Sequence, residues 1–486
     1  MANFNKVKST GPNATSYEGG AAYNKNVVED WTNFLFSSFL ENRYYESGSE
    51  QMKRYLALTD AVAQEFGYEF VAKASFFARN ELGMRSIAQL TAAYLNDKTF
   101  ADKRAYFRNF CHRPDDVAET FAAIENVGSG KRSHALVRGF GDYLSNLNDY
   151  QLGKYKLSNK NYNMFDCINI CHAHSKSIDK YKAGLLEASE TWEVKISAAG
   201  SDNQAKQQEW RTLVEKGNLG YIALIRNLRN ILQAAPSLEW IVTFLIPQIE
   251  NEDAIRKSMI YPYQIYCAYK NLNQWDCMNV VAALDKAFRV AAGNMPELPG
   301  SSVIMLDVSG SMDDRISRNS DMTIKEVGAV YAAAIYVQSK DCDFVKFGTS
   351  AKKDSYFKYG NVFQMISRMQ ANDNIGYGTN ISAAYQQLNR HYDRIFLISD
   401  MQIMNNRGYW YGEQSGNTAY NLYCKRYGVA KIYSFDLGNY KTQTDNPNNP
   451  NVFLFTALND KIFDFIELAE KGTNLVDYIN ENYSYV

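Results

Sequence analysis

Residues 303–312 read VIMLDVSGSM, and this stretch decides how the second half of the chain is interpreted. Four apolar residues precede Asp307, which predicts a buried strand that ends at this carboxylate. Ser309 and Ser311 follow at alternate positions, so three oxygen-bearing side chains come at the end of the strand. Because ligands of open parallel sheets bind at the carboxyl ends of the strands, the stretch predicts a binding site.

Short apolar runs alternate with helical stretches throughout residues 301–486. The apolar runs are rich in β-branched and aromatic residues, as buried parallel strands are, and read SVIMLDV, CDFVKFG, RIFLISD, KIYSFDL and NVFLFTA. Helices are predicted at IKEVGAVYAAAIYVQS and VFQMISRMQ, and a final helix is predicted after DKIFDF. Residues 301–486 therefore predict a doubly wound, Rossmann-like α/β domain.

Two further segments bring oxygen atoms to the same edge of this sheet. Thr379 lies in the glycine-rich segment IGYGTNIS just before a predicted helix, and Asp400 ends the strand RIFLISD. Hydroxyl and carboxylate oxygens suit Mg²⁺, with Mn²⁺ and Ca²⁺ as the other divalent candidates and water completing the shell. The alternative role for Ser309 and Ser311 is to cap the turn that follows the strand.

This pattern resembles the metal-ion-dependent adhesion site of von Willebrand factor A domains. The DxSxS motif stands as Asp307, Ser309 and Ser311, and Thr379 and Asp400 match the motif's threonine and second aspartate. The resemblance implies that these five residues bind Mg²⁺ or another divalent cation as a cofactor. It also implies that the ion's open position takes a carboxylate from an acidic protein partner, and a phosphate would serve there too.

Residues 27–292 have a helical pattern of apolar residues almost throughout. Segments such as RSIAQLTAAYLND, HALVRGFGDYLSNL and GYIALIRNLRNILQ each place apolar residues on one helical face. Successive amphipathic helices with short links predict an all-α, HEAT-like array. The glycine and two prolines of AAGNMPELPGSS mark the boundary, which gives an N-terminal arm (1–26), a helical-repeat domain (27–292) and the α/β domain (301–486).

The order of the helical segments resembles the TROVE module of the Ro autoantigen family. The segments include KRSHALVRGFGDYL, KYKLSNKNYNMFDCINICHAH, TWEVKIS and EWRTLVEKGNLGYIALIRNLRNIL, followed by the junction ALDKAFRVAAGNMPELPGSSVIMLDVSGSM. The resemblance implies a ring of helical repeats that the von Willebrand factor A domain closes. It also implies an RNA-binding scaffold for RNA stability or quality control, which binds small noncoding, Y-like RNA and takes single-stranded 3′ ends of misfolded RNA into a central hole. An exoribonuclease is one candidate for the acidic partner at the metal site.

Basic residues are in surplus where the family resemblance places an RNA surface. Residues 101–182 hold 13 Lys and Arg against 9 Asp and Glu, whereas residues 301–486 hold 18 against 20. For any single lysine, the alternative is a solvated helix face. The family's RNA-binding lysine and histidine correspond to Lys154 and His172, and the arginine usually found between them is not evident. The candidate RNA-binding residues are Lys131, Arg132, Arg138, Lys154, Lys156, Lys160 and His172.

Composition excludes several other classes. The formal net charge of −1 excludes a global basic field, and no stretch has the roughly 18 uninterrupted apolar residues of a membrane span. We expect a monomeric, cytoplasmic protein that does not bind membranes.

The seven scattered cysteines indicate reduced thiols. CINICHAHS (167–175) places Cys167, Cys171, His172 and His174 close together, and core cysteines on a helix are favoured there over a zinc site.

Motifs of catalysis are absent from the sequence. It has no P-loop lysine motif, no HExxH helix and no hydrolase elbow, so we expect a binding protein and not an enzyme. One alternative to the RNA scaffold is a metal-dependent protein-interaction module whose von Willebrand site captures an acidic residue of a partner. A further alternative is an accessory subunit of an ATP-driven metal-insertion or remodelling complex.

Overall fold

A computed structural model describes most of the chain and shows two compact units, each built from separate stretches of sequence. The described residues are 11–37, 45–127, 130–155, 157, 161–186, 192–272, 278–316, 320–355, 358–404, 416–455, 466, 470 and 475–486. The mixed unit comprises those within 1–26, 43–46 and 195–467. The helical unit comprises those within 27–42, 47–194 and 468–486. Residues 195–292 thus group with the sheet, and the predicted domain boundaries remain a prediction.

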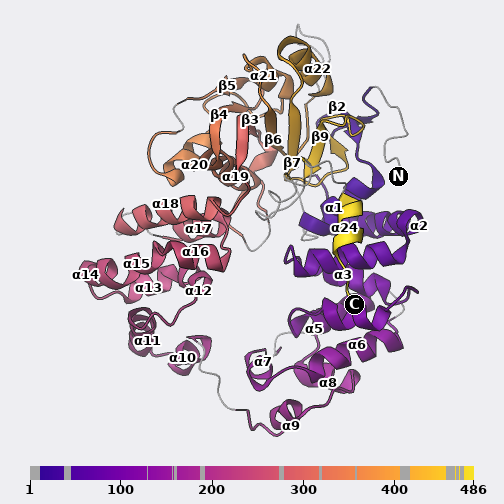
Figure 1. Cartoon of the computed structure of the whole chain (residues 1–486), viewed down its shortest axis with the longest axis vertical. Helices are drawn as coiled ribbons and strands as arrows, with labels where there is room; N and C mark the ends of the chain where they lie inside the picture. Colours follow the sequence, from indigo (N-terminus) through magenta and orange to yellow (C-terminus); the bar gives the residue numbers. More distant parts are fainter. Residues whose placement is uncertain are drawn as a thin grey trace. The chain divides into compact units, whose positions relative to one another are not determined.

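The helical unit contains ten helices in its described part, including the last helix of the chain (Figure 1). They are α1 (Val27–Ser37), α2 (Gly48–Asn80), α3 (Ser86–Leu95), α4 (Lys103–Phe110), α5 (Asp115–Val127), α6 (His134–Ser145), α7 (Asp149–Lys154), α8 (Met164–Ile170), α9 (Lys176–Lys182) and α24 (Leu475–Asn482). Helix α10 (Trp192–Ala198) spans the division between the units. No helix in the described ranges is both long enough and apolar enough to span a membrane.

Local sequence signals and one buried ion pair organise the helical unit. Ser47 and Glu50 form a reciprocal capping box at the start of α2, which satisfies backbone donors that the first helical turn leaves free. Asp116 on α5 accepts two hydrogen bonds from the Arg79 guanidinium, at 2.9 and 2.7 Å, and a third from Gln89 at 2.8 Å. Since both charged side chains are almost fully buried, this network fixes α2, α3 and α5 together.

The C-terminal segment completes the helical unit. The ring of Phe77 on α2 contacts Tyr478 and Tyr483, with centroid distances of 6.5 and 4.6 Å. Tyr485 packs edge-on against Tyr106 at 5.4 Å, and its backbone carbonyl accepts a hydrogen bond from Asn109. Aromatic packing therefore joins the last residues of the chain to the helices α2 and α4.

The mixed unit contains the sheet domain and the helices that precede it. Its helices are α11 (Asn203–Glu215), α12 (Tyr221–Arg226), α13 (Leu228–Ala234), α14 (Leu238–Trp240), the π-helix η1 (Ile241–Leu245), α15 (Ile246–Ile249), α16 (Glu252–Ser258), α17 (Pro262–Lys270), α18 (Met278–Ala292), the 3₁₀ helix η2 (Ser311–Asp313), α19 (Ile324–Gln338), α20 (Val362–Gln370), α21 (Ile381–Gln386) and α22 (Gly416–Tyr427). Its strands are β1 (Ala14–Thr15), β2 (Ala21–Asn24), β3 (Leu298–Asp307), β4 (Ser339–Phe347), β5 (Ala351–Lys353), β6 (Arg394–Ser399), β7 (Lys431–Asp436), β8 (Thr442–Gln443) and β9 (Val452–Phe455).

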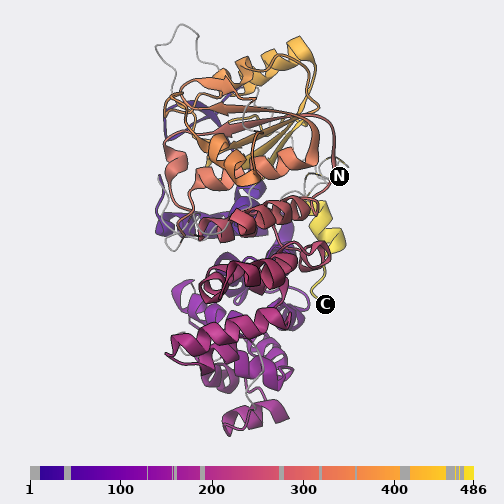
Figure 2. The same ribbon diagram turned by 90° about the vertical axis from the view of Figure 1, so that its left-hand side faces the viewer.

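The main sheet confirms the α/β class expected for the second half. Its strand order is β5-β4-β3-β6-β7-β9, and every neighbouring pair is parallel except β4 with β5. Helices α19 and α20 lie on one face and α21 and α22 on the other (Figures 1 and 2). The five predicted strands correspond to β3, β4, β6, β7 and β9, and the two predicted internal helices to α19 and α20.

Alternate residues of the central strand β3 face the two helical layers. Val303 and Met305 join a buried cluster with residues of α21 and α22. Leu306 faces α19, where a methyl group added at Gly328 would lie 2.9 Å from its Cδ1 atom. The sheet is therefore buried on both faces, which explains its continuous apolar strands.

The N-terminal arm forms a second, three-stranded antiparallel sheet in the mixed unit, with the order β1-β2-β8. Lys25, which follows β2, makes a 2.6 Å ion pair with Asp436 at the end of β7, and both side chains are fully buried. The sequence predicted only an arm here, because strands of two and four residues carry too little periodicity to be recognised. A buried ion pair thus fixes the start of the chain to the main sheet.

Replacement of Lys25 by Met is expected to destabilise the mixed unit strongly, because it leaves the Asp436 carboxylate buried without its cation. Removal of one partner of a buried pair costs about 3–5 kcal/mol. The measurement is the urea midpoint of the mixed unit's unfolding transition, with the exposed Lys340→Met as the matched control. The double variant Lys25→Met/Asp436→Asn is expected to recover part of the loss; an unchanged midpoint in Lys25→Met would contradict the assignment.

Candidate metal site

The two predicted aspartates lie at the ends of adjacent parallel strands. Asp307 is the last residue of β3 and Asp400 follows β6, with Leu306 and Ile398 opposite each other in the register. The chain leaves β3 for β4 on one side and later returns to β6 on the other, so the two strands flank the topological switch point of the sheet. Both aspartates stand at strand ends, as the sequence pattern predicts, and their carboxylates are fully buried.

Hydrogen bonds link the DxSxS residues. The backbone N–H of Ser309 donates to Oδ1 of Asp307 at 2.9 Å, and the hydroxyls of Ser309 and Ser311 lie 3.4 Å apart. The hydroxyl of Ser399 donates to Oδ2 of Asp307 at 2.6 Å. Sequence reasoning missed Ser399, although it directly precedes Asp400 in the predicted strand. Both oxygens of Asp307 are therefore oriented by neighbours on β6 and in the turn after β3.

Thr379 reaches the same region from the loop before α21. Its carbonyl accepts from the N–H of Met404 at 3.0 Å, and two residues earlier the Tyr377 carbonyl accepts from Gly310 at 2.9 Å. Gly376 has a φ of 89° in this loop, a conformation that residues with a side chain rarely adopt. The glycine-rich segment therefore packs against the turn that carries the two serines, and Thr379 is buried.

Burial and mutual repulsion dominate the electrostatics of the two aspartates. Burial raises the pKa of Asp307, and burial followed by the charge of Asp307 raises the pKa of Asp400. The hydroxyl of Ser311 partly opposes the rise at Asp400. Among the described residues, Oδ2 of Asp400 and Oγ1 of Thr379 are buried and have no hydrogen-bond partner. Orphaned buried oxygens beside two carboxylates fit a hard divalent cation.

The donor set would consist of two carboxylates, three hydroxyls and water. In the described part of the chain, no group of three or more His, Cys, Asp or Glu side chains is arranged to hold a metal ion. Cys167 and Cys171 therefore belong to no such group in the described part of the chain. Both are buried free thiols, and burial raises the pKa of Cys167 to about 12. Bound at this site, a cation such as Mg²⁺ would supply a positive charge that attracts an anionic group from outside.

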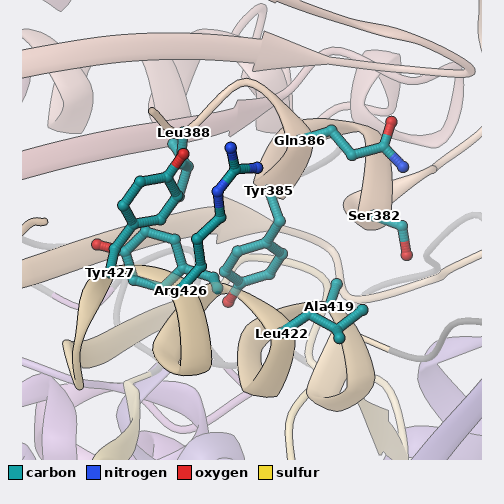
Figure 3. A pocket seen from close by; sticks show the side chains of 9 residues that line it. Ser382, Tyr385, Gln386, Leu388, Ala419, Leu422, Arg426 and Tyr427 are labelled. Atoms are coloured by element: carbon teal, nitrogen blue, oxygen red, sulfur yellow. The ribbon is translucent and has the colours of Figure 1, made fainter. Parts of the chain in front are cut away.

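A separate hollow of about 190 Å³ lies between α21 and α22 (Figure 3). Its lining residues include Tyr385, Tyr423, Tyr427 and Arg426, and none of them is acidic. This pocket therefore lacks the carboxylates of the candidate metal site.

The candidate RNA-binding residues that the structure describes all belong to the helical unit. Lys131 precedes α6 and Arg138 lies on it, and both are exposed. The guanidinium of Arg132 makes intramolecular contacts. It donates to the Tyr162 hydroxyl at 2.6 Å and lies 4.8 Å from the centre of the Phe121 ring. Arg132 therefore supports the packing of its neighbours, and its contact with RNA remains a prediction.

Lys154 and His172, the two residues matched to the family's RNA surface, are exposed. Lys154 ends α7, where it contacts the Tyr150 hydroxyl at 3.3 Å and Glu193 at 3.5 Å. His172 follows α8 with a φ of 52°. Lys156 and Lys160 lie outside the described residues. The arrangement thus offers exposed cations after α5, on α6 and at the end of α7, and an exposed imidazole after α8.

Comparison with known proteins finds one family match and a structural match. Residues 172–280 match the family model of the TROVE domain. Among solved structures, the fold is similar to the crystal structure of the Ro (RSR) protein of Deinococcus radiodurans, with a TM-score of 0.59 and 15% identity over 92% of this chain and 100% of that chain. No curated protein matches the sequence. At this identity the structural likeness shows the fold alone, and the family match shows that residues 172–280 resemble a TROVE domain.

Replacement of Asp307 by Ala is expected to abolish divalent-ion binding and leave the fold intact, because it removes one of two buried carboxylates that repel each other. Isothermal titration with Mg²⁺ tests the binding, and circular dichroism tests the fold. The matched control is Asp321→Asn, which removes one charge at a side chain that is 86% exposed. In the wild type, Mg²⁺ at 100 times its Kd is expected to stabilise the protein by about 2.7 kcal/mol. Unchanged Mg²⁺ binding in Asp307→Ala would contradict the ligand assignment.

Proposed function

We propose that this chain is an RNA-binding, Ro-like scaffold for noncoding RNA. The observation that carries the proposal is the TROVE match at residues 172–280 within a fold that is similar to a Ro protein over 92% of the chain. The proposal includes binding of Y-like RNA, passage of single-stranded 3′ ends into a central hole, and a role in RNA stability or quality control. We further propose that the protein is monomeric and cytoplasmic and has no enzymatic activity.

The charge distribution of the helical unit supports this function. Exposed Lys131, Arg138 and Lys154 are placed to contact phosphates, which attract cations regardless of base sequence. Lys154 lies near two tyrosine rings, Tyr150 and Tyr155, at 5.6 and 5.9 Å. Proteins bind single-stranded RNA with this combination, because bases stack on the aromatic rings and phosphates pair with the cations. The helical unit thus has the chemistry for sequence-independent RNA binding.

The second part of the proposal concerns the metal site. We assign Asp307, Ser309, Ser311, Thr379 and Asp400 to a von Willebrand-type site for Mg²⁺ or another divalent cation. Support comes from the two buried aspartates at the switch point and the unpartnered oxygens of Thr379 and Asp400. Such a site would bind an acidic residue of a protein partner, for which an exoribonuclease is one candidate. If RNA binding fails, this protein-interaction role becomes the leading function.

The test of RNA binding compares a structured RNA that has a single-stranded 3′ tail with a blunt duplex. The variant Arg138→Ala/Lys154→Ala/His172→Ala is expected to bind the tailed RNA more weakly and with a shallower salt dependence. Each lost phosphate contact removes about 0.7–0.9 units from the slope of log affinity against log salt. Fluorescence anisotropy over a salt series measures both quantities.

The matched control is Lys340→Ala/Lys425→Ala, which removes two exposed cations from the mixed unit. It is expected to bind the tailed RNA as the wild type does. Equal affinity and slope for the triple variant and the wild type would remove these residues from the RNA surface. No binding of tailed RNA at low salt would overturn the RNA-scaffold proposal and favour the protein-interaction module.

A further inference from the structure

The turn between β1 and β2 packs against the segment that follows Asp400. The Ser16 hydroxyl donates to the carbonyl of Ile403, and the N–H of Gly20 donates to the same carbonyl at 3.1 Å. The N–H of Tyr17 donates to Oε1 of Gln402 at 3.0 Å. A Cβ atom at Gly20 would lie 2.3 Å from the Ile403 oxygen, so only glycine permits this approach. The N-terminal turn is thus fixed beside the candidate metal site.

Glu18 lies at the centre of this turn and is half-buried. The Tyr45 hydroxyl donates to its Oε1 atom at 2.9 Å, and the backbone N–H of Thr379 also donates to the carboxylate. Gln402, whose side chain accepts from the turn, donates its backbone N–H to Oδ1 of Asp400 at 3.1 Å. Three acidic side chains therefore converge on the loops that carry the predicted ligands.

Aromatic packing keeps Glu18 in this position. The rings of Tyr17 and Tyr45 stack at 5.1 Å, and both meet Tyr440 edge-on, at 5.6 and 5.3 Å. The Lys25–Asp436 ion pair fixes the other end of the same arm. A carboxylate held beside the loops that carry two buried carboxylates is unfavourable unless a cation offsets the repulsion. The arrangement is accounted for when a cation is present.

We propose that Glu18 is an internal acidic group of the metal site, which faces the bound cation and occupies the side from which an acidic partner would approach. The inference rests on the proposed metal site and adds what controls access to it. Since the described residues hold no three acids arranged to bind a metal directly, Glu18 acts through the water shell that Mg²⁺ retains. An external carboxylate then has to displace the N-terminal turn or compete with Glu18 for the ion.

The experiment uses the full chain with Glu18→Gln, which keeps the shape of the side chain and removes its charge. Two quantities are measured by isothermal titration: the affinity for Mg²⁺ alone, and the affinity of an acetylated Gly-Glu-Gly peptide at saturating Mg²⁺. Glu18→Gln is expected to weaken Mg²⁺ binding and to strengthen peptide binding, each by about 5- to 10-fold. A merely structural role would not move the two affinities in opposite directions.

Three further variants make the outcomes distinct. Tyr45→Phe, which removes the hydroxyl that holds Glu18, is expected to change both affinities in the same directions by less. Asp321→Asn is the matched loss of one exposed charge and is expected to change neither. If Glu18→Gln behaves as Asp321→Asn while Asp307→Ala loses Mg²⁺, the role of Glu18 is overturned and the metal site stands. If Asp307→Ala binds Mg²⁺ as the wild type does, the metal site itself is overturned.

Discussion

Two carboxylates buried at neighbouring strand ends place the strictest electrostatic demand on this protein. Asp307 and Asp400 are both fully buried at the point where the sheet's connections diverge. Hydrogen bonds from Ser309 and Ser399 satisfy the oxygens of Asp307, and Oδ2 of Asp400 stays without a partner in the described structure. Buried carboxylates of this kind are unfavourable unless they are neutralised or paired with a positive charge.

A third buried carboxylate at a strand end is paired with a lysine of the same chain. Asp436 terminates β7 and is also fully buried, but its partner is Lys25 from the N-terminal arm. The backbone N–H groups of Gly438 and Asn439 donate to its other oxygen at 3.0 and 2.9 Å. The protein therefore neutralises one buried strand-end acid with its own lysine, whereas Asp307 and Asp400 have no lysine or arginine partner among the described residues.

The sequence predicts the parts of this structure that depend on local pattern. The strand that ends at Asp307 and the helix α19 follow from apolar runs, which are short-range signals, and the structure adds a capping box at Thr323 and Glu326. Asp436 stands at the end of the run KIYSFD and had the same signal as Asp307, although only Asp307 and Asp400 were singled out. For metal ligands, strand-end position and residue type suffice to nominate candidates.

The remaining features depend on tertiary contacts that no local pattern encodes. Glu18 and Lys25 lie in a polar arm whose sequence gives no sign of the strands it joins. The sequence does not distinguish Arg132 from an exposed cation, but its guanidinium donates to Tyr162 and packs on the Phe121 ring. The division of the chain into units is also nonlocal, because residues 195–292 group with the sheet and α24 groups with the first helices. Periodicity identifies helices but not their partners.

The interleaved construction of the units has a consequence during synthesis. Strand β2 (Ala21–Asn24) is translated well before its partner β8 (Thr442–Gln443), which lies about 420 residues further along the chain. At ordinary elongation rates the interval is about 20–80 s, during which the hairpin's outer edge has no strand to pair with. Unpaired edges are sites of aggregation in nascent chains. The polar, glycine-rich character of the arm therefore protects a segment that must wait for the ribosome to finish the sheet.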